Sequence, residues 1–85
     1  MNNEGKIQKK IIDKLTEQGY YVINLIKTNK NGIPDLIALK DGEVPLFVEV
    51  KTKTGRLSEL QKFRIEELKN KGFKAIVLND PKEIN

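Results

Sequence analysis

Two apolar runs joined by a short turn constrain the fold of this chain more than any other feature. The first run, Leu36-Ile37-Ala38-Leu39, follows the loop Gly32-Ile33-Pro34-Asp35, and the second extends from Leu46 to Lys53. Asp41-Gly42 lies between the runs and is a strong turn signal, so we expect a hairpin of two strands. Pro34 restricts its own φ angle and biases its neighbour towards extended geometry, which stiffens the approach to Asp35.

The second strand of this hairpin carries a charged pair among apolar neighbours. Side chains alternate across a strand, so Glu49 and Lys51 share one face, and Val48 and Val50 point to the other. Taken alone, the charged pair fits an exposed ion pair worth under about 1 kcal/mol. A strand with apolar neighbours is normally buried on at least one face, however, and a buried acid needs a compensating partner.

Asp35 supplies a second acid close to Glu49 if the two strands pair. Two carboxylates about 4 Å apart repel by roughly 4 kcal/mol at an effective dielectric constant of 20. A divalent cation removes that conflict, and its ligands must be oxygen atoms because the 85 residues include no cysteine and no histidine. Oxygen ligands favour Mg²⁺, with Mn²⁺ as a substitute, over zinc. We therefore expect Asp35 and Glu49 to hold Mg²⁺, with Lys51 directed at the same substrate phosphate.

The same residues resemble a known nuclease signature. Pro34-Asp35, a following strand and Glu49-Val50-Lys51 resemble the PD-(D/E)XK pattern, and Gly32-Ile33-Pro34-Asp35 with Gln61 is similar to its VRR-NUC branch in a stand-alone form. The resemblance extends from Glu4 to Leu78. It implies one nuclease domain over residues 1–85, with a backbone carbonyl ligand at Val50 and these catalytic residues: Asp35, Glu49, Lys51 and Gln61.

Periodicity and turn residues predict the order α-β-β-β-α-β. The helices are expected at Glu4 to Gln18, stopped by Gly19, and at Ser58 to Lys71, stopped by Gly72. The strands are expected at Tyr20 to Ile26, Leu36 to Leu39, Leu46 to Lys53 and Phe73 to Leu78. A right-handed crossover places the fourth strand parallel to the third. The expected fold is α/β, a mixed four-stranded sheet flanked by two helices, which matches the restriction-endonuclease-like core that the resemblance implies. After Asn79 we expect a frayed, polar C-terminus.

Two features of the first helix have two interpretations each. Glu4 heads the inward stripe of this helix, either as a first-turn carboxylate favoured by the helix dipole or, as the resemblance implies, as a further acid at the metal. The opposite face is basic, either as a solvated surface or as a contact to phosphate. Its residues are Lys6, Lys9, Lys10 and Lys14.

Gln61 also has two interpretations. Ser58 followed three residues later by Gln61 forms a capping box, which begins the second helix. Gln61 also lies seven residues before Leu68, on the inward face of that helix, and the resemblance places a glutamine here in the active site. One side chain would serve the two roles in turn.

The charge balance favours a polyanionic partner. Sixteen Lys and Arg against twelve Asp and Glu give a net charge of +4 and a pI near 9.4. Lys27 and Lys30 in the polar loop before Asp35 are expected to contact the DNA backbone, although the loop also fits an ordinary hairpin connection. Lys53, Arg56 and the start of the second helix form another cationic group suited to phosphate.

No apolar stretch approaches the length of a membrane span, and the N-terminus lacks the charged and apolar regions of a signal peptide. We therefore expect a soluble, cytoplasmic protein with no membrane partner.

The leading hypothesis is a Mg²⁺-dependent deoxyribonuclease, an endonuclease that hydrolyses DNA phosphodiester bonds. The short chain has no room for a sequence-reading domain, which leaves recognition through phosphates open. The need to cut two strands favours a two-fold homodimer acting on branched DNA, and stand-alone members of the resembling family are similar to Holliday-junction resolvases. The alternatives are a non-catalytic nucleic-acid-binding or assembly module, and a nuclease subunit that needs a partner for specificity.

Overall fold

The structure, a computed structural model, describes residues 3–84, which form two helices, four strands and a short 3₁₀ helix. The elements are α1 (Asn3–Glu17), β1 (Tyr21–Asn24), β2 (Leu36–Leu39), β3 (Leu46–Val50), α2 (Glu59–Asn70), β4 (Lys74–Leu78) and η1 (Pro81–Glu83). The strands make one sheet in the order β1-β2-β3-β4, with two antiparallel pairings followed by a parallel pairing of β3 with β4. The predicted element order and mixed sheet are confirmed.

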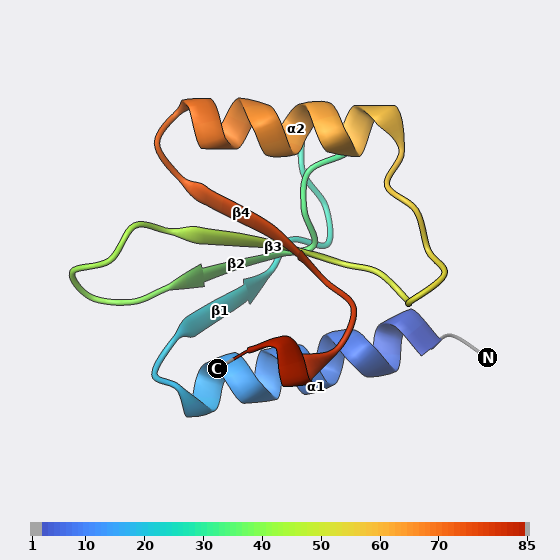
Figure 1. Ribbon diagram of the computed structural model, residues 1–85. Helices are drawn as coiled ribbons and strands as arrows, with labels where there is room; N and C mark the ends of the chain where they lie inside the picture. Colours follow the sequence, from blue (N-terminus) through green and yellow to red (C-terminus); the bar gives the residue numbers. More distant parts are fainter. Residues whose placement is uncertain (1–2, 85) are drawn as a thin grey trace.

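The two helices cover opposite faces of the sheet (Figure 1). On the α1 face, Ile11 and Leu15 pack with Val48 and Val50 of β3 in one apolar cluster. Ile11, Val48 and Val50 are 0% exposed. Because Val48 and Val50 both turn towards α1, the pleat of β3 directs Glu49 to the opposite face.

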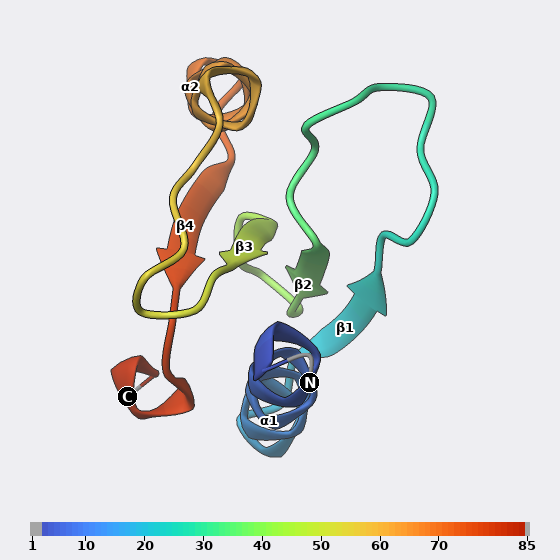
Figure 2. The ribbon, with the colours of Figure 1, turned by 90° about the vertical axis from the view of Figure 1, so that its right-hand side faces the viewer.

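The face under α2 has a smaller apolar core. Ile65 and Leu68 of α2 are buried against Ala75 of β4, with Phe47 of β3 packed beside them. The Phe47 ring meets the Phe73 ring edge-on, with 5.8 Å between the ring centroids. Figure 2 shows α2 over the β4 side of the sheet, while the loop of residues 25–35 rises on the same face beyond β1 and β2. The end of β3 therefore lies between α2 and this loop.

The strand register brings the two acids together. Leu36 of β2 pairs with Val48 of β3, so the adjoining residues Asp35 and Glu49 meet where β2 begins and β3 ends. On the other side, Lys51 N–H donates to the Leu78 carbonyl at 3.0 Å, which continues the parallel ladder one residue past β3.

Three strands are shorter than the sequence predicted, and the smallest difference is in β4, which begins at Lys74 instead of Phe73. β1 ends at Asn24 instead of Ile26: Leu25 N–H still donates to the Asp35 carbonyl at 2.7 Å, but Ile26 is 85% exposed. β3 ends at Val50 rather than at Lys53, and a turn closed by a hydrogen bond from Gly55 N–H to the Thr52 carbonyl at 3.0 Å follows on the way to α2.

The segment after β4 is ordered, so the prediction of a frayed end is wrong for residues 79–84. Asp80 caps η1: its carboxylate accepts a hydrogen bond from Lys82 N–H at 2.9 Å. The Glu83 carboxylate in turn accepts from Asp80 N–H at 3.0 Å. Ile84 packs against the cluster on the α1 face. Two local caps and one apolar anchor are enough to fix a polar segment that shows no periodicity.

The helices are short, with 15 residues in α1 and 12 in α2. Within residues 3–84, none has the combination of length and apolar character that crossing a bilayer requires.

The substitution of isoleucine by valine should lower stability more at a buried position on the α1 face than at an exposed position on β1. Ile11→Val deletes a methylene-sized group from a fully buried site and should lower the free energy of unfolding by about 0.5–1.5 kcal/mol. Ile23→Val makes the same change on β1, where the side chain is 41% exposed, and should cost less than about 0.5 kcal/mol. Urea denaturation followed by circular dichroism measures both values. Equal losses would show that Ile11 is not a core anchor.

Candidate active site

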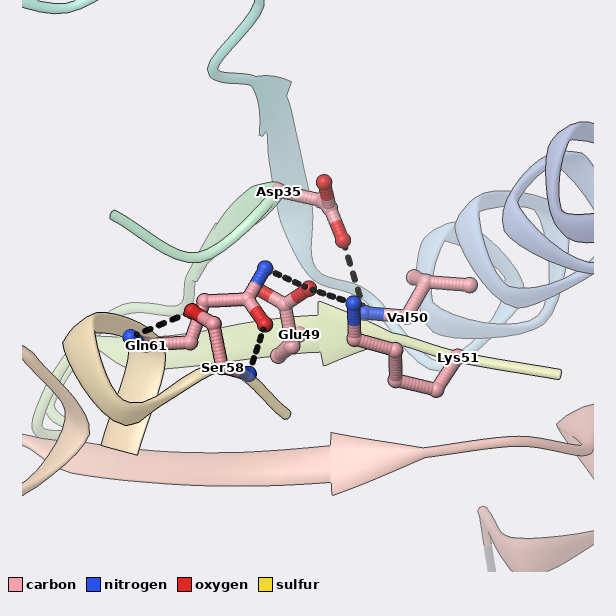
Figure 3. A network of polar contacts seen from close by, with 6 residues as sticks. All are labelled: Asp35, Glu49, Val50, Lys51, Ser58 and Gln61. Atoms are coloured by element: carbon pink, nitrogen blue, oxygen red, sulfur yellow. Dashed lines mark hydrogen bonds and ion pairs between the residues drawn. The ribbon is translucent and has the colours of Figure 1, made fainter. Parts of the chain in front are cut away.

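Asp35 is fixed in place by the end of β3. Its Oδ2 atom accepts a hydrogen bond from Val50 N–H at 2.8 Å (Figure 3). Pro34, the residue before it, is among the fully buried side chains, which anchors the backbone on the other side of the acid. One hydrogen bond thus joins the loop before β2 to the last residue of β3.

Glu49 is a buried acid, only 2% exposed. Its Oε2 atom accepts a hydrogen bond from Gln61 Nε2 at 3.3 Å and lies 3.6 Å from the ammonium nitrogen of Lys51. The structure therefore brings together the four side chains that the sequence singled out as catalytic: Asp35, Glu49, Lys51 and Gln61.

The carboxyl group of Glu49 binds its proton more tightly than an ordinary glutamate. Burial is the largest cause, and the charge of Asp35 adds to it, so that the pKa of Glu49 rises from 4.5 to about 7. A hydrogen bond from the protonated Glu49 carboxyl group to the Asp35 carboxylate and the charge of Glu4 act in the same direction. Lys51 opposes the shift without cancelling it. The site therefore holds more negative charge than its own lysine offsets.

Gln61 uses both ends of its side-chain amide. Its Oε1 atom accepts from Ser58 N–H at 2.9 Å, and Ser58 Oγ accepts from Gln61 N–H at 3.1 Å, which completes the predicted capping box of α2. The Nε2 atom of the same amide donates to Glu49. The side chain thus makes the capping contact and reaches Glu49 at the same time (Figure 3), and an active-site role for Gln61 stays a prediction. The start of α2 thereby orients the buried acid.

The loop before Asp35 is held against α2 by contacts that sequence reasoning missed. Arg64 Nε donates to the Asn31 carbonyl at 2.9 Å. Gly32 has a φ angle of +80° and packs so closely that an added Cβ would lie 2.7 Å from Leu60 Cγ. Arg64 lies three residues after Gln61, on the same side of the helix, and this spacing is the signal that would have pointed to it.

The predicted DNA-binding residues fall into two places. Lys27 and Lys30 are exposed and line a hollow of about 470 Å³ together with Asp35. The loop thus borders Asp35, and contact of its lysines with the DNA backbone stays a prediction. Lys53 and Arg56 are exposed in the connection between β3 and α2, and Lys53 lines a separate pocket beside α1.

The donor chemistry of the site fits a divalent cation bound by oxygen. Asp35 and Glu49 offer carboxylate oxygens, and Mg²⁺ is usually bound by one or two carboxylates together with waters and phosphate oxygens. In the described residues 3–84, no group of three or more Asp, Glu, His or Cys side chains is placed to hold a metal ion. Glu4 therefore does not complete a three-acid cluster here, although its charge reaches Glu49. A role for Glu4 at a metal stays a prediction.

The topology, with two acids meeting at the end of a central strand, is that of a nuclease-type domain. The model of the VRR-NUC domain family matches residues 2–80, and the chain belongs to this family. A solved structure described as a VRR_NUC domain is similar, with a TM-score of 0.85 and 26% sequence identity over 98% of this chain and 90% of that chain. A search of curated proteins found no match. The family and fold implied by the sequence resemblance are confirmed, and the family implies DNA as the substrate.

The close contact of Gly32 with Leu60 predicts that the loop positions Asp35. Gly32→Ala should be costlier than Gly42→Ala, because Gly42 has a φ of +77° but nothing within 4 Å of an added Cβ. The φ strain alone costs about 1–2 kcal/mol. For Gly42→Ala we expect this loss of stability and near-normal nuclease activity. For Gly32→Ala we expect a larger loss of stability and reduced nuclease activity.

Adding Leu60→Ala to Gly32→Ala should restore part of the lost stability and activity, since it removes the clash. Chemical denaturation and a nuclease assay on all three variants measure these effects. Identical behaviour of the two glycine variants would refute a positioning role for this contact.

The raised pKa of Glu49 predicts pH-dependent stability in metal-free buffer. Between about pH 4.5 and 7 the folded protein keeps a proton that the unfolded chain has lost. The free energy of unfolding should therefore fall as pH rises through this range and level off above it. Glu49→Gln removes this titration. The free energy of unfolding of the variant, measured relative to that of the wild type, should therefore rise by roughly 3 kcal/mol from pH 4 to pH 8. Thermal unfolding in EDTA measures the difference, and a pH-independent difference would contradict the prediction.

Proposed function

We propose that this protein is a metal-dependent endonuclease that hydrolyses phosphodiester bonds of DNA. The observation that carries the proposal is the buried Glu49 carboxyl group, which faces Asp35 and contacts both Lys51 and Gln61, in a chain of the VRR-NUC family. Two acids in contact destabilise a fold, and a purely structural role does not require them. Strongly shifted acids of this kind gather at catalytic sites.

We propose Mg²⁺ as the cofactor, with Mn²⁺ as a substitute. Asp35, Glu49 and the carbonyl of Val50 would hold the ion, with Glu4 assisting directly or through water. When bound, the cation supplies positive charge that orients the attacking water and stabilises the charge developing on the phosphate. Burial and the nearby charge of Asp35, which raise the pKa of Glu49 to about 7, support this assignment.

The chain's own residues prepare the site in two ways. The ammonium group of Lys51, held 3.6 Å from Glu49, would neutralise the phosphate and favour deprotonation of the attacking water. Gln61, tied to the start of α2, keeps the Glu49 carboxyl group in one orientation, as Val50 N–H does for Asp35. Both acids are therefore positioned by regular secondary structure, which limits the reorganisation needed for reaction.

Recognition would act mainly through the DNA backbone. Lys27 and Lys30 line the hollow next to Asp35, and Lys53 and Arg56 extend from the connection between β3 and α2. Exposed lysines and arginines on both sides of a catalytic site bind phosphates without reading bases.

We further propose branched DNA as the substrate and a homodimer as the active form. A two-fold pair of sites matches the two strands that must be cut in a four-way junction. Several large apolar side chains of α2 and β4 remain exposed, among them Phe63, Ile76 and Val77, and a second copy would cover such a surface.

Cleavage of a labelled four-way junction and a matched linear duplex tests the proposal. With Mg²⁺ or Mn²⁺ we expect paired, symmetric nicks in the junction, and none with EDTA. Asp35→Asn, Glu49→Gln and Lys51→Ala should each lower the cleavage rate at least 100-fold, because each removes a group that acts on the reacting phosphate. Folding and DNA binding should persist in all three.

Lys71→Gln, an exposed lysine at the end of α2, is the matched control and should cleave normally. Light scattering gives the mass of the active species, which should be that of a dimer. Equal cutting of both substrates would discard the junction preference. Metal-independent cleavage, or full activity in Glu49→Gln, would overturn the assigned site, and binding without cleavage would favour the non-catalytic module or the partner-dependent subunit.

A further inference from the structure

A second basic region lies beside α1, apart from the acid pair. Three segments far apart in sequence enclose a pocket of about 610 Å³: the first half of α1, the start of the connection between β3 and α2, and the segment around η1. Figure 2 shows these three segments converging at the lower edge of the sheet. Each segment contributes lysine to the pocket lining, which contains Lys6, Lys10, Lys53 and Lys82.

The charge of this pocket is strongly unbalanced. Four lysines face one acid, Asp80, whose carboxylate is already engaged as the N-cap of η1 through Lys82 N–H. Among the ion pairs formed within residues 3–84, none includes Lys10, Lys53 or Lys82. The lysine face of α1 is also divided, since Lys9 is paired with Asp13 at 3.1 Å outside the pocket. Like charges gathered around one hollow repel, and a bound anion relieves that repulsion.

The pocket adjoins the catalytic strand. Lys53 follows Lys51 by two residues, which span at most about 7 Å of extended chain. On the other wall, Lys6 lies two residues after Glu4, whose charge acts on Glu49. An anion in this pocket is therefore close to any phosphate held at the acid pair.

We propose that this lysine pocket, formed by Lys6, Lys10, Lys53 and Lys82, binds a backbone phosphate of the same DNA strand that is cut, and so sets the path of that strand across the site. The proposal rests on the proposed nuclease function for the identity of the nucleic acid. The ordered C-terminal segment then has a role, because it carries Lys82 to the pocket.

Salt-dependent DNA binding tests this assignment on the intact protein. The pocket variant Lys10→Gln/Lys82→Gln is compared with a control, Lys71→Gln/Lys74→Gln, which removes equal charge from exposed positions at the other end of the sheet. Fluorescence anisotropy with labelled duplex, in EDTA to prevent cleavage, gives the dissociation constant at several salt concentrations. Each lost phosphate contact lowers the slope of log K against log salt by about 0.9.

We expect the pocket variant to bind about tenfold more weakly, with a slope smaller by one to two, and the control to change less than twofold. Equal effects of the two variants would overturn the pocket and show a general charge effect only. Inorganic phosphate and a deoxynucleoside monophosphate are titrated separately. Tight binding of either one that depends on Lys10 and Lys82, with DNA affinity unchanged, would assign the pocket to a free phosphate and also overturn the proposal.

The outcome is separable from that of the nuclease proposal. A wild-type protein that cleaves DNA while the pocket and control variants behave alike refutes the pocket alone. Loss of cleavage in Asp35→Asn together with a pocket-specific change in salt slope supports both. A wild-type protein that neither binds nor cleaves DNA refutes both.

Discussion

The buried carboxyl group of Glu49 is the constraint on which the site depends. Its position follows from β3, because Val48 and Val50 fill the core under α1 and leave the residue between them facing α2. Burial and the neighbouring Asp35 make the charged form costly. The fold tolerates this cost through one lysine and one amide, Lys51 and Gln61, which are too few to neutralise the pair. This residual negative charge is the basis for the proposed cation.

The contacts around Glu49 also connect the elements of the fold. Val50 N–H holds Asp35 and the loop before β2, and Gln61 joins Glu49 to the start of α2. Arg64 then returns from α2 to the same loop. The loop, β3 and α2 form a closed set of hydrogen bonds around a small α2-side core. In a chain with so little buried apolar area, polar contacts of this kind fix the geometry that packing alone would leave loose.

Local sequence signals determined most of the fold. The apolar run at Leu36, the turn at Asp41-Gly42 and the Ser58 to Gln61 capping box each act over a few residues, so their structures follow from the chain itself. The acid pair was predictable for the same reason, since a hairpin register sets Asp35 against Glu49. Strand ends were less predictable, because they depend on distant partners such as the contact between Leu25 and Asp35.

The sequence by itself thus determined the order of the elements, the face of β3 that carries Glu49 and Lys51, and the family to which the chain belongs. The tertiary structure alone decided what surrounds that face. The shift in the pKa of Glu49 depends on burial, the dual role of Gln61 depends on the docking of α2, and the lysine pocket depends on an ordered segment after β4. The physical reason is range: propensity, pleat and capping act between neighbours in sequence, whereas desolvation and charge accumulate from residues that only folding brings together.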